Sequence, residues 1–226
     1  MVPGAPGISQ AQSSLPSRFF DSVTFPLIAI PDDSSTGDDN SKLTTEETSV
    51  KNPQIESTDA TSGHDLTPPH GLDEIIATFG NIYEYIGTGG QLAPRWRSDF
   101  LAKTSLPFPL RLAWDPSRVI TQMTCHRLMT GIFASVFAAI QKNALESKVV
   151  SFGGCFAFRP QRTGSKLSAH SWGIAIDLNP GSNRQGSAGD MDARVVEFFK
   201  NAGFEWGGDW KGKTRDPMHF QFCTGY

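Results

Sequence analysis

Apolar positions with a clear helical period lie beyond residue 70 of the chain. Six of them recur every three or four residues between Cys125 and Leu145, which predicts the main buried helix; they are Leu128, Ile132, Phe133, Val136, Phe137 and Ile140. A shorter helix is predicted over Gly71–Phe79. A third should begin at Asp190 or Asp192 and end in a left-handed cap at Gly203.

Four short runs have the pattern of β-strands. They are Leu110–Trp114, which follows the two breakers Pro107 and Pro109, and then Lys148–Phe152, Gly173–Leu178 and Met218–Phe222. In the third run the isoleucines and Leu178 alternate with Asp177, so this carboxylate should point away from the core. Helices and strands in this irregular order predict an α+β fold with a small, largely antiparallel sheet flanked by helices.

Residues 1–70 have a different character. From Asp32 to Asp65 there are nine acidic residues, two lysines and no Phe, Trp or Tyr. Such a segment buries too little apolar surface to offset the entropy of ordering it. We therefore expect a disordered, flexible, acidic and Ser/Thr-rich N-terminal segment over residues 1–70 and one folded domain over residues 71–226.

The start of the chain does not have the features of a secretory signal, and no apolar run reaches the length of a transmembrane helix. These observations predict a soluble product with no evident export route. Three cysteines without C-x-x-C spacing indicate small buried residues, although one oxidised pair is an open alternative. Basic residues are scattered and no nucleic-acid motif occurs, which disfavours a nucleic-acid-binding domain.

Two histidines and several carboxylates in the C-terminal part form a set suited to zinc. His170 precedes the predicted strand that carries Asp177, and His219 follows Asp216 at the start of the last predicted strand. Two imidazoles and one carboxylate are typical ligands of catalytic zinc, because three protein ligands leave the fourth tetrahedral position to water. Asp216 lies three residues before His219 and is placed to serve as a general base. Each residue alone also fits an ordinary turn or a hydrogen-bonded core histidine.

The motif Ser168-x-His170-x-x-Gly173-x-Ala175-x-Asp177, followed by Asp216-x-x-His219, resembles the signature blocks of the VanY-type D-alanyl-D-alanine carboxypeptidases and the related L-alanyl-D-glutamate endopeptidases. The similarity is clearest from Val149 to Phe222. The resemblance implies that His170, Asp177 and His219 bind Zn²⁺ and that Asp216 is the base.

The same resemblance implies that Arg159 stabilises the oxyanion and that Ser168 contacts the substrate. Arg162 competes with Arg159 for the first role, and Ser168 alternatively caps local backbone. Three tryptophans near the motifs either line a cleft or pack in the core: Trp172, Trp206 and Trp210.

The function implied is hydrolysis of peptide bonds in peptidoglycan stem peptides, at the cell wall, either as a carboxypeptidase or as an endopeptidase. Hedgehog-type signalling domains have a similar metal site, so a non-catalytic zinc-containing binding module for cell-wall or protein ligands is the alternative.

Overall fold

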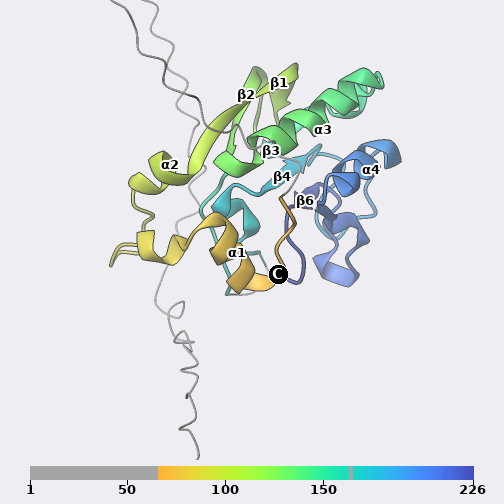
Figure 1. Cartoon of the computed structure of the whole chain (residues 1–226). Helices are drawn as coiled ribbons and strands as arrows, with labels where there is room; N and C mark the ends of the chain where they lie inside the picture. Colours follow the sequence, from red (N-terminus) through yellow and green to blue (C-terminus); the bar gives the residue numbers. More distant parts are fainter. Residues whose placement is uncertain (1–65, 163–164) are drawn as a thin grey trace, which may run out of the picture.

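The computed structural model describes residues 66–162 and 165–226. The acidic segment expected to be disordered lies almost entirely outside the described residues. Leu66 packs against the core, and the backbone around residues 69–71 is tied to the C-terminal end by two hydrogen bonds, from Gly71 N to Thr224 O (2.8 Å) and from Thr224 N to Pro69 O (2.9 Å). The C-terminus therefore lies beside the first helix (Figure 1).

Six strands form one mostly antiparallel sheet, which confirms the predicted fold class. Their order is β2-β1-β3-β4-β6-β5, and only the β1–β3 pair is parallel. The strands are β1 (Leu101–Leu112), β2 (Asp115–His126), β3 (Ser151–Gly154), β4 (Ala175–Leu178), β5 (Glu205–Trp206) and β6 (His219–Gln221). The α-helices are α1 (Gly71–Phe79), α2 (Arg95–Phe100), α3 (Thr130–Lys142) and α4 (Ala193–Asn201). Short 3-10 helices connect them, among them η4 (Ala169–Trp172) and η5 (Gly207–Asp209).

Two predicted element boundaries are wrong because β1 and β2 form a long hairpin. The predicted helix was placed from Cys125, but β2 continues to His126 and α3 begins at Thr130. The predicted strand at Leu110 begins nine residues earlier, at Leu101, and passes through both prolines. Pairing with β2 is interrupted between Ser105 and Leu110, so the prolines occupy a bulge in which no ladder hydrogen bond is lost.

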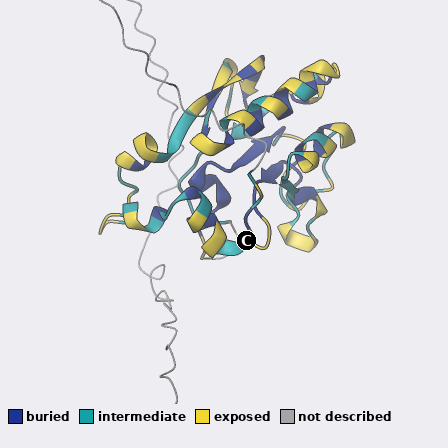
Figure 2. Cartoon of the chain, viewed as in Figure 1, coloured by how far each residue is buried: buried dark blue, intermediate teal, exposed yellow. Residues whose placement is uncertain are grey.

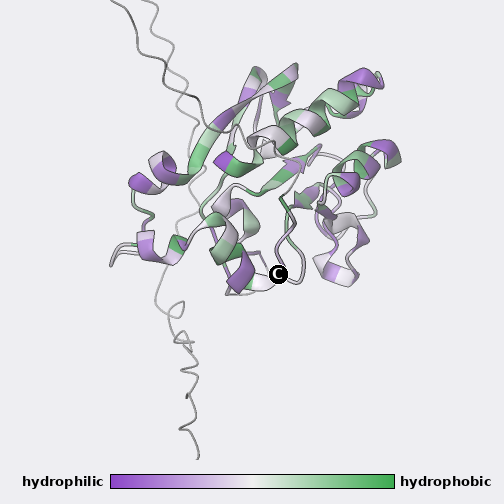
Figure 3. Ribbon diagram, viewed as in Figure 1, coloured by the Kyte–Doolittle hydropathy of each residue, from purple (hydrophilic) through white to green (hydrophobic). Residues whose placement is uncertain are grey.

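The bounds of helices α1 and α4 confirm the predictions made from the sequence. Helix α1 has the predicted bounds, and α4 begins after Asp192, whose side chain accepts a hydrogen bond from Arg194 N (2.9 Å). Gly203 follows the end of α4 with a φ of +96°, as the left-handed cap requires. In Figure 3 the helices α3 and α4 each carry hydrophilic and hydrophobic residues, while β4, an inner strand of the sheet, is mainly hydrophobic.

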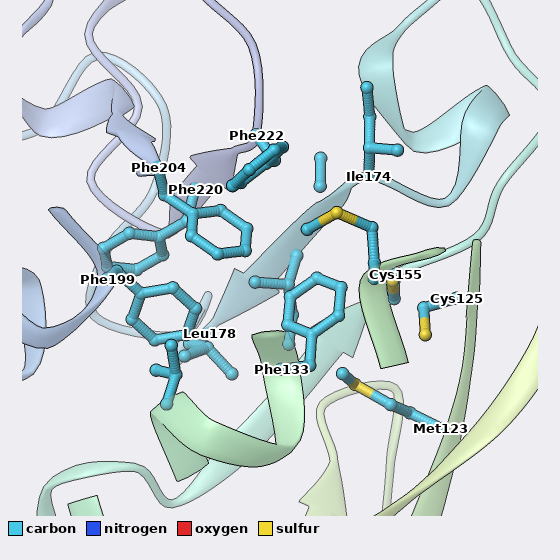
Figure 4. Packing of buried hydrophobic residues seen from close by; sticks show 14 of the residues in the cluster. Met123, Cys125, Phe133, Cys155, Ile174, Leu178, Phe199, Phe204, Phe220 and Phe222 are labelled. Atoms are coloured by element: carbon cyan, nitrogen blue, oxygen red, sulfur yellow. The ribbon is translucent and has the colours of Figure 1, made fainter. Parts of the chain in front are cut away.

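The core lies between the sheet and helices α3 and α4. Phenylalanines from these helices and from the C-terminal strands meet there, with Phe199 stacked on Phe220 at 4.3 Å between ring centroids (Figure 4). Phe133 of α3 packs against Phe204, and Phe204 against Phe222. Burying one such ring stabilises the fold by about 2–3 kcal/mol, so this cluster fixes the strands that carry the candidate site.

The three cysteines are all buried and free, as their spacing indicated. No helix among residues 66–162 and 165–226 is both long and apolar enough to span a bilayer.

Candidate metal centre

Two of the three predicted ligands are paired directly across the sheet. Strands β4 and β6 are antiparallel, and their register places Asp177 opposite His219. Residues opposite one another in an antiparallel pair project from the same face, about 5 Å apart at Cβ. Asp177 lies on the opposite side of β4 from Ile176 and Leu178, which belong to the core, as the alternation predicted. It is nevertheless buried, because it faces the two histidines and not solvent.

The third ligand, His170, comes from η4, whose ends are both fixed. Ser168 Oγ accepts a hydrogen bond from His170 N (3.4 Å) at the start of the 3-10 helix. Gly173 ends it in the left-handed region, with a φ of +71°. A Cβ at Gly173 would lie 2.7 Å from His126 N, so the close approach of β2 also excludes a larger residue there. The whole of η4 and β4 is buried (Figure 2).

The three predicted ligand side chains converge on one point. His170 Nε2 lies 3.2 Å from Asp177 Oδ1 and 3.2 Å from His219 Nδ1, and His219 Nδ1 lies 2.9 Å from Asp177 Oδ1. All three residues are buried, none being more than 6% exposed.

The outer nitrogen of each histidine has a partner that sets the tautomer. His170 Nδ1–H donates to the carbonyl oxygen of Cys155 (2.7 Å). His219 Nε2–H donates to Gln221 Oε1 (3.1 Å), while the amide nitrogen of Gln221 donates to Cys223 O. Both imidazoles therefore direct lone pairs at each other and at the carboxylate. Three such acceptors at this distance repel one another unless a cation or a proton lies between them.

The donor set and its spacing fit zinc. Tetrahedral zinc has metal–ligand distances of about 2.0–2.2 Å, which corresponds to about 3.3 Å between neighbouring ligand atoms. The three spacings of 2.9–3.2 Å are close to that value. Two imidazole nitrogens, each oriented by an outer hydrogen bond, together with one carboxylate oxygen are the usual surroundings of a catalytic zinc ion.

Burial and neighbouring charges act in opposite directions on the ionisable groups of the centre. Burial acts to raise the pKa of Asp177, but the charge and hydrogen bonds of the two histidines hold that pKa well below its usual range. Burial lowers the pKa of His170. The carboxylate is therefore ionised and His170 favours its neutral form, which are the states in which both bind a metal.

Asp216 lies at the turn that leads into β6. Its backbone oxygen accepts from His219 N (3.0 Å), and its own N–H donates to Gly207 O (2.8 Å). Its Oδ1 is buried with no hydrogen-bond partner. Burial, and then the negative charge of Asp177, raise the pKa of Asp216 to about 6. An unpartnered carboxylate oxygen with this pKa is suited to accept a proton near neutral pH.

Arg159 and Arg162 both act electrostatically on this region. The backbone of Arg159 is tied to the residues around η4, since Ser168 N donates to Arg159 O (2.9 Å) and Arg159 N donates to Ser171 Oγ (3.2 Å). Burial lowers the pKa of Arg159, opposed by the charges of Asp177 and Asp216. Arg162 is exposed and interacts electrostatically with Asp216. Both candidates for the oxyanion role are therefore near the centre.

The remaining predicted residues have local contacts. The observed contact of the Ser168 hydroxyl is the cap of η4, and its contact with substrate stays a prediction. Trp172 is fully buried and donates to Gly80 O (3.0 Å), so it belongs to the core. Trp206 stacks on Phe220, whereas the half-buried Trp210 lies 5.5 Å from His219 between ring centroids.

The sequence did not reveal the residues that orient the ligands. Gln221 lies two residues after His219 on the same strand, so its side chain shares the face of His219, and this period-2 relation was an available signal. Glu205 in turn accepts from Trp210 Nε1 (2.6 Å) and from Gln221 Nε2 (3.4 Å), which extends the hydrogen-bond chain to β5. The contribution of the Cys155 carbonyl has no signal in the sequence.

Comparison with known proteins agrees with this geometry. Residues 161–222 match the sequence model of a family described as D-alanyl-D-alanine carboxypeptidase. The matched segment contains all three ligand residues and Asp216. Neither the curated proteins nor the solved structures contain a significant match to the chain. The family match supports a peptidase of the VanY-type group and extends over the part of the chain that builds the centre.

Proposed function

We propose that this protein is a zinc-dependent peptidase that hydrolyses peptide bonds in the stem peptides of peptidoglycan. The observation that carries the proposal is the buried cluster of His170, Asp177 and His219, whose lone pairs converge beside the unpartnered carboxylate of Asp216. The family match to D-alanyl-D-alanine carboxypeptidases supports the substrate class. Peptidase activity on this substrate places the site of action at the cell wall.

In this proposal, His170, Asp177 and His219 hold the metal. A bound Zn²⁺ polarises a scissile carbonyl and lowers the pKa of water, which is the chemistry that peptide hydrolysis needs. The hydrogen bonds from His170 Nδ1–H to Cys155 O and from His219 Nε2–H to Gln221 Oε1 orient both imidazoles, so that each ring in its neutral form presents its other nitrogen to the metal. The metal site is thereby prepared before the ion arrives.

Asp216 is proposed as the general base and acid. Its raised pKa, about 6, leaves it mainly ionised at pH 7, yet it is more basic than an ordinary aspartate. It takes the proton of the attacking water and returns it to the leaving amine. Arg159 is proposed to stabilise the negative charge that develops on the carbonyl oxygen, because its backbone is tied to the residues around η4 and its guanidinium, which stays charged, interacts electrostatically with Asp177 and Asp216.

The alternative is a zinc-containing module that binds ligands without catalysis. Such a module has no need for an ionised carboxylate with a free oxygen beside the metal. The buried, unpartnered Oδ1 of Asp216 therefore favours the enzyme.

Asp216→Asn tests the two functions against each other. The substitution keeps the shape of the side chain and removes the base, so zinc content and unfolding temperature should stay those of the wild type while release of amino groups from peptidoglycan falls about 10²–10⁴-fold. Asp209→Asn, on an exposed residue of η5, is the matched control and should retain activity. Loss of zinc or of folding in Asp216→Asn would assign that residue a structural role and contradict the base assignment.

A further inference from the structure

A groove of about 630 Å³ opens beside the metal centre, and three of its seven lining residues are basic. The basic residues are Arg162, Arg184 and Lys213, and the others are Pro180, Gln185, Gly186 and Met218. The lining includes no acidic residue. An open groove with this composition favours an anionic ligand.

The groove adjoins the ligands of the centre. Met218 in its wall is the chain neighbour of His219. Pro180 lies behind Asp177, since a Cβ placed at Gly153 would touch both the side chain of Asp177 (2.9 Å) and that of Pro180 (3.2 Å). A peptide whose scissile bond is held at the metal can therefore place a group only a few of its own residues away in the groove.

The loops that carry the basic residues are tied to one another. Gly186 N donates to Arg215 O (2.7 Å), which joins the loop of Arg184 to the segment that follows Lys213. Met218 N donates to Asn183 O (3.1 Å), and the fully buried Asn183 donates to Asp190 Oδ1 (2.8 Å). The groove is thus a fixed feature of the backbone.

Among the residues that the structure describes, no carboxylate lies within ion-pair distance of these three cations. The ion pairs of Lys and Arg in the parts of the chain that the structure describes join Arg194 to Asp192 and Lys200 to Asp209. Of these three cations, Arg162 interacts electrostatically with Asp216 at the centre. Arg184 and Lys213 are left to a ligand, and a guanidinium binds a carboxylate with two parallel hydrogen bonds.

We infer that Arg184 and Lys213 bind a carboxylate of the substrate and so determine which peptide bond is cut. The inference rests on the proposed function, because the anionic groups of a stem peptide are carboxylates. Two carboxylates have this chemistry: the C-terminal carboxylate of a terminal D-Ala, and an internal one such as that of D-Glu. Binding of the first makes the enzyme a carboxypeptidase, and binding of the second makes it an endopeptidase.

The test measures peptide binding to zinc-loaded full-length protein carrying Asp216→Asn, so that no cleavage intervenes. One pair of ligands is a peptide ending in D-Ala-D-Ala as the free acid and as its C-terminal amide. The other pair is a stem peptide with D-Glu or with D-isoglutamine. Calorimetry gives the preference for the charged member of each pair, in the parent and after Arg184→Gln with Lys213→Gln. The matched control replaces the exposed Lys103 and Lys142, on β1 and α3, by Gln.

The expected result is that the double variant lowers the preference about 100-fold, or about tenfold per cation, in one of the two pairs only, while the control leaves it unchanged. The pair that responds identifies the carboxylate. Preferences within twofold of the parent in both pairs would overturn the inference and leave the proposed function intact. Failure of the zinc-loaded parent to bind any of the four peptides would contradict the proposed function itself, and with it the occupant assigned to the groove.

Discussion

Replacement of Gln221 by Leu should weaken zinc binding, although Gln221 is not itself a ligand. The amide oxygen of Gln221 accepts from His219 Nε2–H at 3.1 Å, and its amide nitrogen is held by Cys223 O at 3.3 Å. Leu has a similar volume and no acceptor, so the buried N–H of His219 loses its partner and the neutral Nδ1 tautomer is no longer favoured. Loss of such an outer partner lowers metal affinity about 10–100-fold, or about 1.4–2.7 kcal/mol.

The assay is competition for zinc against a chromophoric chelator at fixed pH. Gln122→Leu on the exposed part of β2 is the control and should bind zinc as the wild type does. Gln221→Glu should retain more affinity than Gln221→Leu, since a carboxylate still accepts from His219. Zinc affinity within twofold of the wild type in Gln221→Leu would refute the idea that this hydrogen bond prepares the ligand.

Three further predictions concern charge, backbone and pH. Arg159→Gln should lower kcat/KM on peptidoglycan peptides about 10²–10³-fold with zinc content unchanged, and an unchanged kcat/KM would transfer the oxyanion role to Arg162. Gly173→Ala should lower the free energy of unfolding by about 3 kcal/mol, because Gly173 has a positive φ and a Cβ there would lie 2.7 Å from His126 N. The control Gly131→Ala lies in α3, where a Cβ meets nothing within 4 Å, and should raise the free energy of unfolding slightly. Equal effects of the two substitutions in chemical denaturation would contradict this prediction. Burial lowers the pKa of His126 to about 4, whereas in the unfolded chain it is about 6.5. The unfolded state therefore binds a proton more readily between these two values, and about 3 kcal/mol of stability, fully present above pH 6.5, should be lost as the pH falls to 4. His126→Gln should flatten the pH dependence of unfolding over that window, and an unchanged slope would contradict the assignment.

The parts of the fold that were predictable from sequence are those in which one face is buried. Helix α4 and strand β4 have apolar positions at the expected period, and Asp192 and Gly203 mark the ends of the helix. Strand β2 was missed because most of its residues are exposed and polar, so it has no apolar period. Strand β1 was truncated because its prolines were read as breakers, although the bulge between Ser105 and Leu110 accommodates them.

The three residues that converge at the candidate centre were predictable from the sequence, and the residues that surround them were not. The spacing of His170, Asp177 and His219 corresponds to a motif, and the β4–β6 register brings the last two together. The oxygen of Cys155 and the amide of Gln221 act through contacts that depend on how distant segments pack. The basic groove likewise combines loops that are separated in the chain, so along the sequence its basic residues are only scattered positions.

The most direct test of the central claim is metal content by mass spectrometry on purified wild type and His170→Ala, alongside release of amino groups from peptidoglycan with and without a chelator. We expect one zinc per wild-type chain, its loss in His170→Ala, and release that the chelator abolishes. Wild-type protein that contains no zinc, either as purified or after zinc is resupplied, would contradict a metal centre at His170, Asp177 and His219.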